Sequence, residues 1–336
     1  MKKLLVFCLV VLVAATGVYA AGKAFPKRDI TNVVVWAAGG GTDVCNRIVS
    51  AEMAKILGVN INVVNKTGGV GGSVGMAHAF SQPADGYTLC GLSESCVTAG
   101  VQGGWDQRME VWDFFIVGGS PDLISVTPGT PYKSLKDLVE AAKKAPGTIK
   151  AGASASGSIH HLNLLAFEKG AGIKLNYIPY PGSAPAQNAA MTGEVSLVIT
   201  SLAEQQQLIR GGKLRPLAML IPNDFTVADV GRIPSAFTDY PGLKQYLPIS
   251  QAIGFAVPAK TPKDVKAVLE GAFKKAMASE AMQKWGKENY YLLSGKTGAE
   301  ARKEFNNLES LFAWTLWELG AAKVDPATLK IPKPAR

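Results

Sequence analysis

Residues 33–43, with the sequence VVVWAAGGGTD, decide how the chain around them folds. The run of β-branched residues is typical of a buried strand, and Thr42 and Asp43 are common helix caps. The apolar pattern that follows, up to Gly58, predicts a helix. A strand that turns through glycines into a helix leaves backbone N–H groups free where an anion can bind. A tight turn without a ligand explains the same pattern, so other parts of the chain must distinguish the two.

The length and the first residues indicate an exported protein with room for two domains. The chain has 336 residues, and residues 1–20 carry two lysines, a short apolar run and a small residue, Ala20, at the end. This pattern predicts a cleaved secretory signal peptide rather than a membrane span. The net charge is +9, but the basic residues are scattered, so no nucleic-acid partner is expected.

Two further patterns limit the chemistry of the protein. Glycine-rich residues 68–75 follow a predicted strand, but their spacing misses the dinucleotide fingerprint by one residue, and no Walker phosphate loop is present. No cofactor is therefore expected. Cys45, Cys90 and Cys96 form no C-x-x-C pair, which argues against a structural zinc site. A disulfide that joins Cys96 to Cys90 or Cys45, and three buried free thiols, are both open alternatives.

A second strand–loop–helix unit repeats the pattern of the first. A predicted strand at 149–151 opens into a loop of glycine, alanine and serine, and a helix follows. This loop also directs hydroxyl and backbone N–H groups toward one place. The alternation of strands and helices along the chain predicts an α/β fold. Near the C-terminus, Thr297 and Glu300 have the spacing of a capping box for the last helix.

Several motifs, in order along the chain, resemble one known family. They are GGGTD at 39–43, NKTGGVGG at 65–72, DGYTL at 85–89, the loop at 154–162, PYPGSAPA at 179–186, GEV at 193–195 and GGKLRPLA at 211–218. Each motif alone is weak, whereas their order and spacing together are specific. The chain resembles the Bug, or TctC-like, extracytoplasmic solute receptors of tripartite tricarboxylate transporters.

The resemblance implies a periplasmic protein with a two-lobed, type II-like binding-protein fold. Each lobe would be a mostly parallel sheet flanked by helices, with a ligand cleft between the lobes. The first lobe would contain residues 25–125 and 250–330, and the second lobe residues 126–249. A small carboxylate would lie in the cleft, and the lobes would close on it by hinge motion. Its partners would be the membrane components of the transporter, and the protein would act as a monomer without cofactor or metal.

The two glycine- and serine-rich loops would face each other across this cleft and hold the carboxylate through backbone N–H groups. Asp43 is interpreted as a cap that holds its loop rather than as a ligand of the anion, which it would repel. The residues carried over from the family, or expected to line the cleft beside these loops, are Trp36, Gly40, Gly41, Thr42, Asp43, Ser156, Gly157, Ser158, Tyr180, Gly182, Ser183 and Thr200.

One departure from the family pattern concerns ligand choice. Glu94 stands where small polar residues are usual, and the sequence leaves open whether it faces solvent or the cleft. If Glu94 enters the cleft, it would disfavour a second ligand carboxylate and favour an amine or a hydroxyl. The corresponding hypothesis is that the ligand is not a plain tricarboxylate such as citrate.

An enzyme is the competing class. His160 and His161 lie beside three serines, Ser154, Ser156 and Ser158, and histidine next to serine is a feature of nucleophilic sites. However, no G-x-S-x-G motif is present, and adjacent residues at a helix start cannot face one point. A secreted hydrolase is therefore the alternative function, and the expectation is a protein that is not an enzyme. A third alternative is a ligand sensor built on the same fold.

Overall fold

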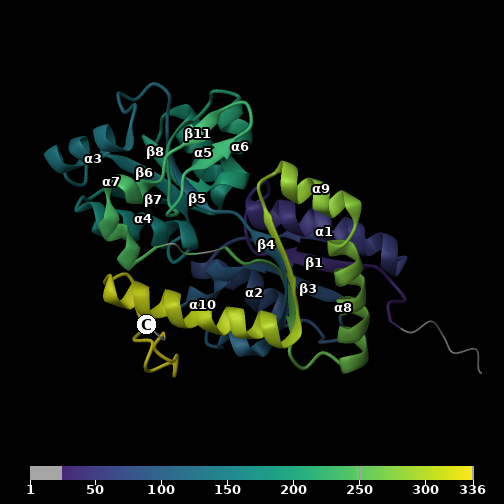
Figure 1. The fold of residues 1–336 in the computed structure, drawn as a ribbon. Coiled ribbons are helices and arrows are strands. Elements are labelled where there is room, and N and C mark those ends of the chain that lie inside the picture. Colours follow the sequence, from purple (N-terminus) through teal and green to yellow (C-terminus); the bar gives the residue numbers. More distant parts are fainter. Residues whose placement is uncertain (1–24, 248, 250, 335–336) are drawn as a thin grey trace, which may run out of the picture.

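The computed structural model describes residues 25–247, 249 and 251–334, which form two lobes (Figure 1). The expected signal peptide, residues 1–20, lies outside the described residues. Each lobe is built on one β-sheet, and helices cover both faces of each sheet. Within the described part of the chain, no helix is both long and apolar enough to span a membrane.

The first sheet has six strands in the order β13-β4-β12-β3-β1-β2. Its strands are β1 (Ile30–Val34), β2 (Ile61–Asn65), β3 (Thr88–Ser93), β4 (Trp112–Gly119), β12 (Ile253–Pro258) and β13 (Leu292–Lys296). Buried residues of α1 (Gly41–Leu57) and α8 (Lys263–Met277) pack on one face, next to α9 (Glu280–Glu288). Residues of α2 (Ser73–Phe80) and the long α10 (Gly298–Glu318) pack on the other.

The second sheet has five strands in the order β7-β6-β8-β5-β9. Its strands are β5 (Asp122–Val126), β6 (Lys150–Ser154), β7 (Asn176–Tyr180), β8 (Leu197–Ser201) and β9 (Arg215–Met219). Residues of α3 (Leu135–Lys144) and α4 (Ile159–Ala171) cover one face, and those of α5 (Ser183–Thr192) and α6 (Leu202–Arg210) cover the other. After β9 come a small hairpin, β10 (Phe225–Val227) and β11 (Gly231–Ile233), and the short α7 (Ala236–Asp239).

Both sheets are mixed rather than mostly parallel. In the first sheet β1 pairs in parallel with β2 and β3, whereas β12 is antiparallel to β3 and β4, and β13 is antiparallel to β4. In the second sheet β5 is antiparallel to both β8 and β9, while β6 is parallel to β7 and β8. The antiparallel strands β12 and β5 are those that the chain forms directly after crossing from the other lobe.

The crossover into the second sheet lies earlier than the sequence indicates. Strand β5 begins at Asp122 and pairs only with strands of the second sheet, so the chain leaves the first sheet at Ser120 and Pro121. The expected boundary between residues 125 and 126 therefore falls inside β5 instead of before it. The pattern of apolar residues marks a strand here, but it does not show with which sheet that strand pairs.

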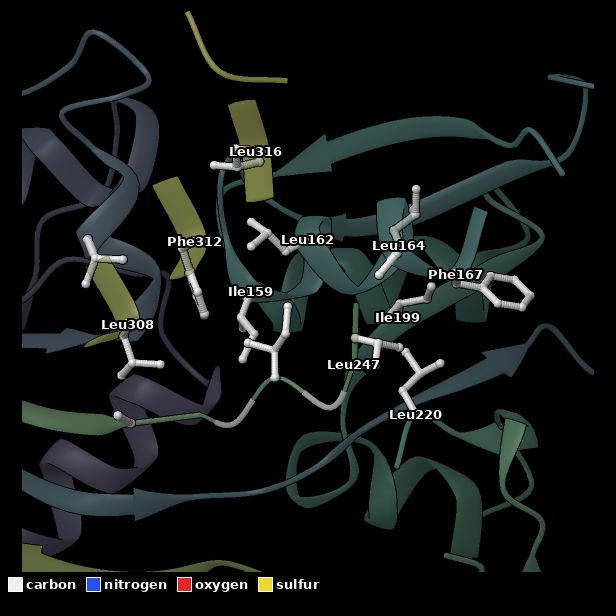
Figure 2. Packing of buried hydrophobic residues seen from close by; sticks show 14 of the residues in the cluster. Ile159, Leu162, Leu164, Phe167, Ile199, Leu220, Leu247, Leu308, Phe312 and Leu316 are labelled. Carbon is white, nitrogen blue, oxygen red and sulfur yellow. The ribbon is translucent and has the colours of Figure 1, made fainter. Parts of the chain in front are cut away.

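One hydrophobic core spans both lobes. Phe312 and Leu316 of α10 lie in the same buried cluster as Ile159 and Leu162 of α4, and Figure 2 shows these side chains directed toward one another. The C-terminal helix of the first lobe is thereby packed against the second lobe. This packing, together with the crossovers, fixes how the two sheets face each other.

The capping box expected at the last helix does not form, although another helix has one. Ser134 and Asp137 form a capping box at the start of α3. Thr297 and Glu300 do not form one at α10, because the Thr297 hydroxyl donates a hydrogen bond to Glu270 instead. Cys45, Cys90 and Cys96 are buried free thiols.

Candidate ligand-binding site

A cavity lies between the lobes, where the N-termini of several helices meet. The helices α1, α4, α5 and α6 begin beside it, as does a short 3-10 helix at Glu94–Thr98. Its volume is about 20 Å³, room for roughly one water molecule, so the lobes are closed on each other. The first lobe contributes Trp36, Gly40, Gly41, Thr42, Ser93, Glu94, Ser95, Gln251 and Ile253, and the second lobe Ser154, Ser158, His160, Gly182, Ser183 and Glu204.

Both loops singled out in the sequence contribute to the lining of this cavity, but the hydrogen bonds of the second loop across the cleft go to the 3-10 helix at Glu94–Thr98 rather than to the first loop. Ser95 Oγ accepts a hydrogen bond from the backbone N–H of Ile159, 3.0 Å away in the other lobe. The Thr98 hydroxyl donates to the carbonyl of Gly157 at 2.8 Å. Of the residues expected to bind ligand, those that line the cavity are Trp36, Gly40, Gly41, Thr42, Glu94, Ser158, Gly182 and Ser183.

The remaining expected residues support the loops without lining the cavity. Asp43 accepts hydrogen bonds from the Gly39 N–H and the Asn65 amide, and so holds the first loop in place. The Tyr180 hydroxyl donates to Glu194, and Thr200 accepts a hydrogen bond from Gln187 within the second lobe. Ser156 and Gly157 lie in the second loop, directly before Ser158, the N-cap of α4, and they do not line the cavity.

Glu204 places a carboxylate at the very helix terminus where a ligand carboxylate was expected. Its Oε1 atom accepts a hydrogen bond of 2.7 Å from the backbone N–H of Gly41, at the start of α1 in the other lobe. Its Oε2 atom accepts from the backbone N–H and the hydroxyl of Ser201, which closes a capping box on α6. The S-x-x-E pattern at 201–204 indicates the capping box, but no local pattern indicates the contact with Gly41.

His160 is the cation of the cavity. Its Nδ1 atom lies 2.7 Å from Asp122 Oδ2, and its Nε2 atom lies 3.5 Å from Glu204 Oε2. Burial alone lowers the pKa of a histidine, but the charges of Asp122, Glu204 and Glu94 outweigh it and raise the His160 pKa to about 9. The imidazole is therefore protonated at neutral pH, and both of its nitrogens donate hydrogen bonds.

The spatial arrangement of a hydrolytic triad is present in Ser183, His160 and Asp122. Ser183 Oγ lies 3.2 Å from His160 Nε2, and Asp122 lies at the other ring nitrogen. A triad needs a neutral imidazole that accepts the serine proton. A His160 whose pKa is raised well above that of a free histidine holds its proton, and this does not suit a general base. The arrangement suits the binding of a negatively charged group, since the imidazolium and the start of α5 face the same cavity.

The neighbouring histidine has a structural role. His161 stacks on Tyr177 with ring centroids 4.2 Å apart, and its Nδ1 accepts a hydrogen bond from the N–H of Gly157. Burial, with a smaller effect of the Lys174 charge, lowers the His161 pKa to about 4. The two histidines thus point in different directions, as adjacent positions on a helix require.

Glu94 faces the cavity and not the solvent. Its side chain lines the space between the lobes, and the residue is 1% exposed. Its Oε2 accepts from the backbone N–H of Ala252 at 2.7 Å, and its Oε1 accepts from the Ser95 hydroxyl at 2.8 Å. Burial raises the Glu94 pKa, although these hydrogen bonds oppose the shift. No group of histidine, cysteine and acidic side chains is placed to hold a metal ion within the described residues.

Known proteins share the sequence over most of its length. A Cupriavidus necator relative, described as the UPF0065 protein in the gbd 5′ region, is 30% identical over 291 residues, which cover 84% of this chain and 85% of that protein. Protein BugT of Bordetella pertussis is 32% identical over 217 residues, which cover 62% of this chain and 66% of BugT.

Solved structures share the two-lobed fold. The periplasmic binding protein BugD has a TM-score of 0.80 and 25% identity, and the match covers 89% of this chain and 99% of that one. Rpa4515 of R. palustris, solved with adipate, has a TM-score of 0.79 and 24% identity, and the match covers 89% of this chain and 99% of that one. MatC of Rhodopseudomonas palustris, solved with bound malate, has a TM-score of 0.75 and 22% identity, and the match covers 88% of this chain and 98% of that one.

A family model described as the tripartite tricarboxylate transporter family receptor matches residues 45–293. The match includes the whole second sheet and the part of the first lobe that runs from within α1 to the start of β13, but not β1 or α10. The proteins similar to this chain are binding proteins and receptors rather than enzymes. The chain therefore belongs to the tripartite tricarboxylate transporter receptor family.

Proposed function

We propose that this protein is a periplasmic receptor that captures a small carboxylate between its lobes and delivers it to the membrane components of a tripartite tricarboxylate-type transporter. In this proposal residues 1–20 are a cleaved signal peptide, and the mature chain is a monomer. The observation that carries the proposal is the position of His160, which lies 2.7 Å from Asp122 and 3.2 Å from Ser183 and lines a cavity between the lobes together with Ser158.

These groups together form a site for a carboxylate. The N-cap of α5 is Gly182, which has no side chain to cap the helix, so the first N–H groups of α5 are free to bind an anion. The imidazolium of His160, whose two N–H groups donate to Asp122 and Ser183, adds a positive charge beside them. Ligands bound by relatives fit this chemistry, because adipate and malate are both small carboxylates.

The closed cavity implies that the lobes open to admit a ligand. A space for about one water cannot hold a carboxylate with several carbon atoms. The crossovers at Ser120–Pro121 and before Ile253 are the connections about which the lobes would move, with lobe 1 built from the first sheet and lobe 2 from the second.

Titration calorimetry of the mature chain with a panel of small carboxylates tests this function. We expect binding with 1:1 stoichiometry, a loss of at least tenfold in affinity in His160→Gln, and no change in the matched control His78→Gln on α2. A panel without any binding carboxylate, or equal affinities in His160→Gln and the native protein, would refute the proposal. Light scattering checks that the mature chain is monomeric, and mass spectrometry of the exported protein checks the cleavage after Ala20.

A further inference from the structure

The cavity brings one cation together with several acidic groups, and Glu204 Oε2 lies 3.5 Å from His160 Nε2. The His160 imidazolium is already neutralised by Asp122, whose Oδ2 lies 2.7 Å from Nδ1. Two further carboxylates, those of Glu94 and Glu204, line the same space. Among the described residues, neither of them forms a salt bridge with a lysine or an arginine. The cavity therefore carries an excess of negative charge.

Because Glu204 already accepts a hydrogen bond from the first loop, this loop is not suited to bind an anionic ligand. The Glu204 carboxylate sits on the N–H of Gly41, and a Cβ added to Gly41 would come within 2.9 Å of Glu204 Oε1. Opening of the lobes breaks this contact but does not take the carboxylate away from the cleft, because its hydrogen bonds with Ser201 belong to the second lobe alone. A ligand carboxylate beside Gly41 would therefore lie against a like charge.

Thr42 adds a third acceptor to the cavity. The residue lines the cavity and is 7% exposed, and its hydroxyl makes no hydrogen bond within the described part of the chain. A carboxylate has about four lone-pair positions. Glu94 and Glu204 each use only some of them for hydrogen bonds with the protein. Three acceptors thus remain available in one enclosed space.

We propose that the ligand carries a protonated amine, whose N–H groups donate to Glu94, Glu204 and Thr42, together with a carboxylate that faces His160 and Ser183. An ammonium group has three donors and one positive charge, which matches three acceptors and an excess of negative charge. The ligand class is that of small zwitterionic amino acids, and plain di- and tricarboxylates are disfavoured. This inference rests on the proposed receptor function, and it assigns the substrate class.

Matched pairs of ligands separate the amine from the carboxylate. Titration calorimetry compares alanine with lactate, and aspartate with malate, since each pair shares a carbon skeleton and exchanges an amine for a hydroxyl. We expect the amino acid of at least one pair to bind ten times more tightly than its hydroxy acid. Equal or tighter binding of the hydroxy acids overturns the inference and leaves the receptor function standing. Absence of binding by every carboxylate refutes both.

Variants test which residues recognise the amine. In Glu94→Gln, Glu204→Gln and Thr42→Val we expect the preference for the amino acid over its hydroxy acid to fall at least fivefold. Glu52→Gln is the control, because Glu52 is a buried glutamate of α1 that does not line the cavity. An unchanged preference in both glutamate variants contradicts the assignment. If a variant fails to fold, the ligand that the native protein retains during purification provides the readout. This ligand is released by denaturation and tested for a primary amine. A retained ligand without an amine overturns the proposal.

Discussion

The Glu204 carboxylate and the backbone N–H of Gly41, 163 positions apart in the chain, form a hydrogen bond of 2.7 Å that joins the two lobes. Glu204 comes from the start of α6 in the second lobe, and Gly41 is the first residue of α1 in the first. The protein thus places its own carboxylate on a helix terminus that could otherwise bind an anion. This contact joins the two lobes across the cleft.

Glu204→Gln is expected to weaken this contact. A hydrogen bond to a charged group contributes about 1.5–3 kcal/mol, so we expect a loss of that order in the free energy of unfolding, measured with urea. Small-angle scattering should also show a larger radius of gyration without ligand, because more molecules are open. Ser201→Ala is the control, since it removes one capping hydrogen bond of Glu204 but leaves the contact with Gly41. The same radius of gyration in Glu204→Gln and the native protein would contradict this role.

Stability should depend on pH through the two histidines, with opposite signs. The His160 pKa of about 9 lies above the value near 6.5 of an unfolded chain, so its stabilisation is complete below pH 6.5 and is lost as the pH rises through 9. The His161 pKa of about 4 lies below that value, so its stabilisation is present above pH 6.5 and is lost as the pH falls toward 4.

Urea unfolding between pH 4 and 9.5 measures both effects, each at most about 1.4 kcal/mol per pH unit. His160→Gln should flatten the alkaline side of the profile only, and His161→Asn the acid side only. A profile whose alkaline slope persists in His160→Gln would show that the imidazole of His160 is not the group that titrates there.

Gly157 is expected to be required for closure of the lobes. Its φ of +83° is unfavourable for other residues, and a Cβ there would lie 2.7 Å from Thr98 Oγ1 in the opposite lobe. Gly172 also has a positive φ, but a Cβ there meets nothing within 4 Å. Both alanine variants should lose about 1–2 kcal/mol of stability to backbone strain, whereas only Gly157→Ala should lose ligand affinity. Equal affinities in the two variants would argue against this contact in the ligand-bound state.

Phe312 is expected to stabilise the packing between the lobes. Its side chain is fully buried in the core shared by α10 and α4 (Figure 2). Phe312→Ala should lower the free energy of unfolding by about 3–5 kcal/mol, because it removes apolar contacts and leaves a cavity. Leu292→Ala, at a side chain that is 77% exposed, should change it by less than about 0.5 kcal/mol. Thermal unfolding of the two variants measures the difference.

Features that are determined by residues close together in the sequence were predictable from it. The helix predicted after residues 33–43 ends at Leu57 with Gly58 as its C-cap, as expected, since caps, stop signals and apolar periodicity are local. The edge strand β13 is not predicted, because its half-exposed residues 292–296 lack a clear alternation and gain their structure by pairing with β4.

The loops of the site were predictable, but their partners were not. The glycine and serine patterns identify the helix N-termini that line the cavity. Helical geometry requires His160 and His161 to diverge, yet it does not say which one faces the cleft. That choice depends on Asp122, from a strand that begins 38 positions earlier. The role of Glu204 at Gly41 likewise depends on how the lobes pack.

The position of β12 has a consequence for how the protein reaches its folded state. This strand lies inside the first sheet, between β3 and β4, although it follows the whole second lobe in the chain. During synthesis or export from the N-terminus, the first lobe cannot be completed until residues 253–258 arrive, whereas the second sheet is one continuous segment that can form earlier. The order of folding is thus the reverse of the order of the lobes, and the first lobe stays open to chaperones and to the export machinery until late.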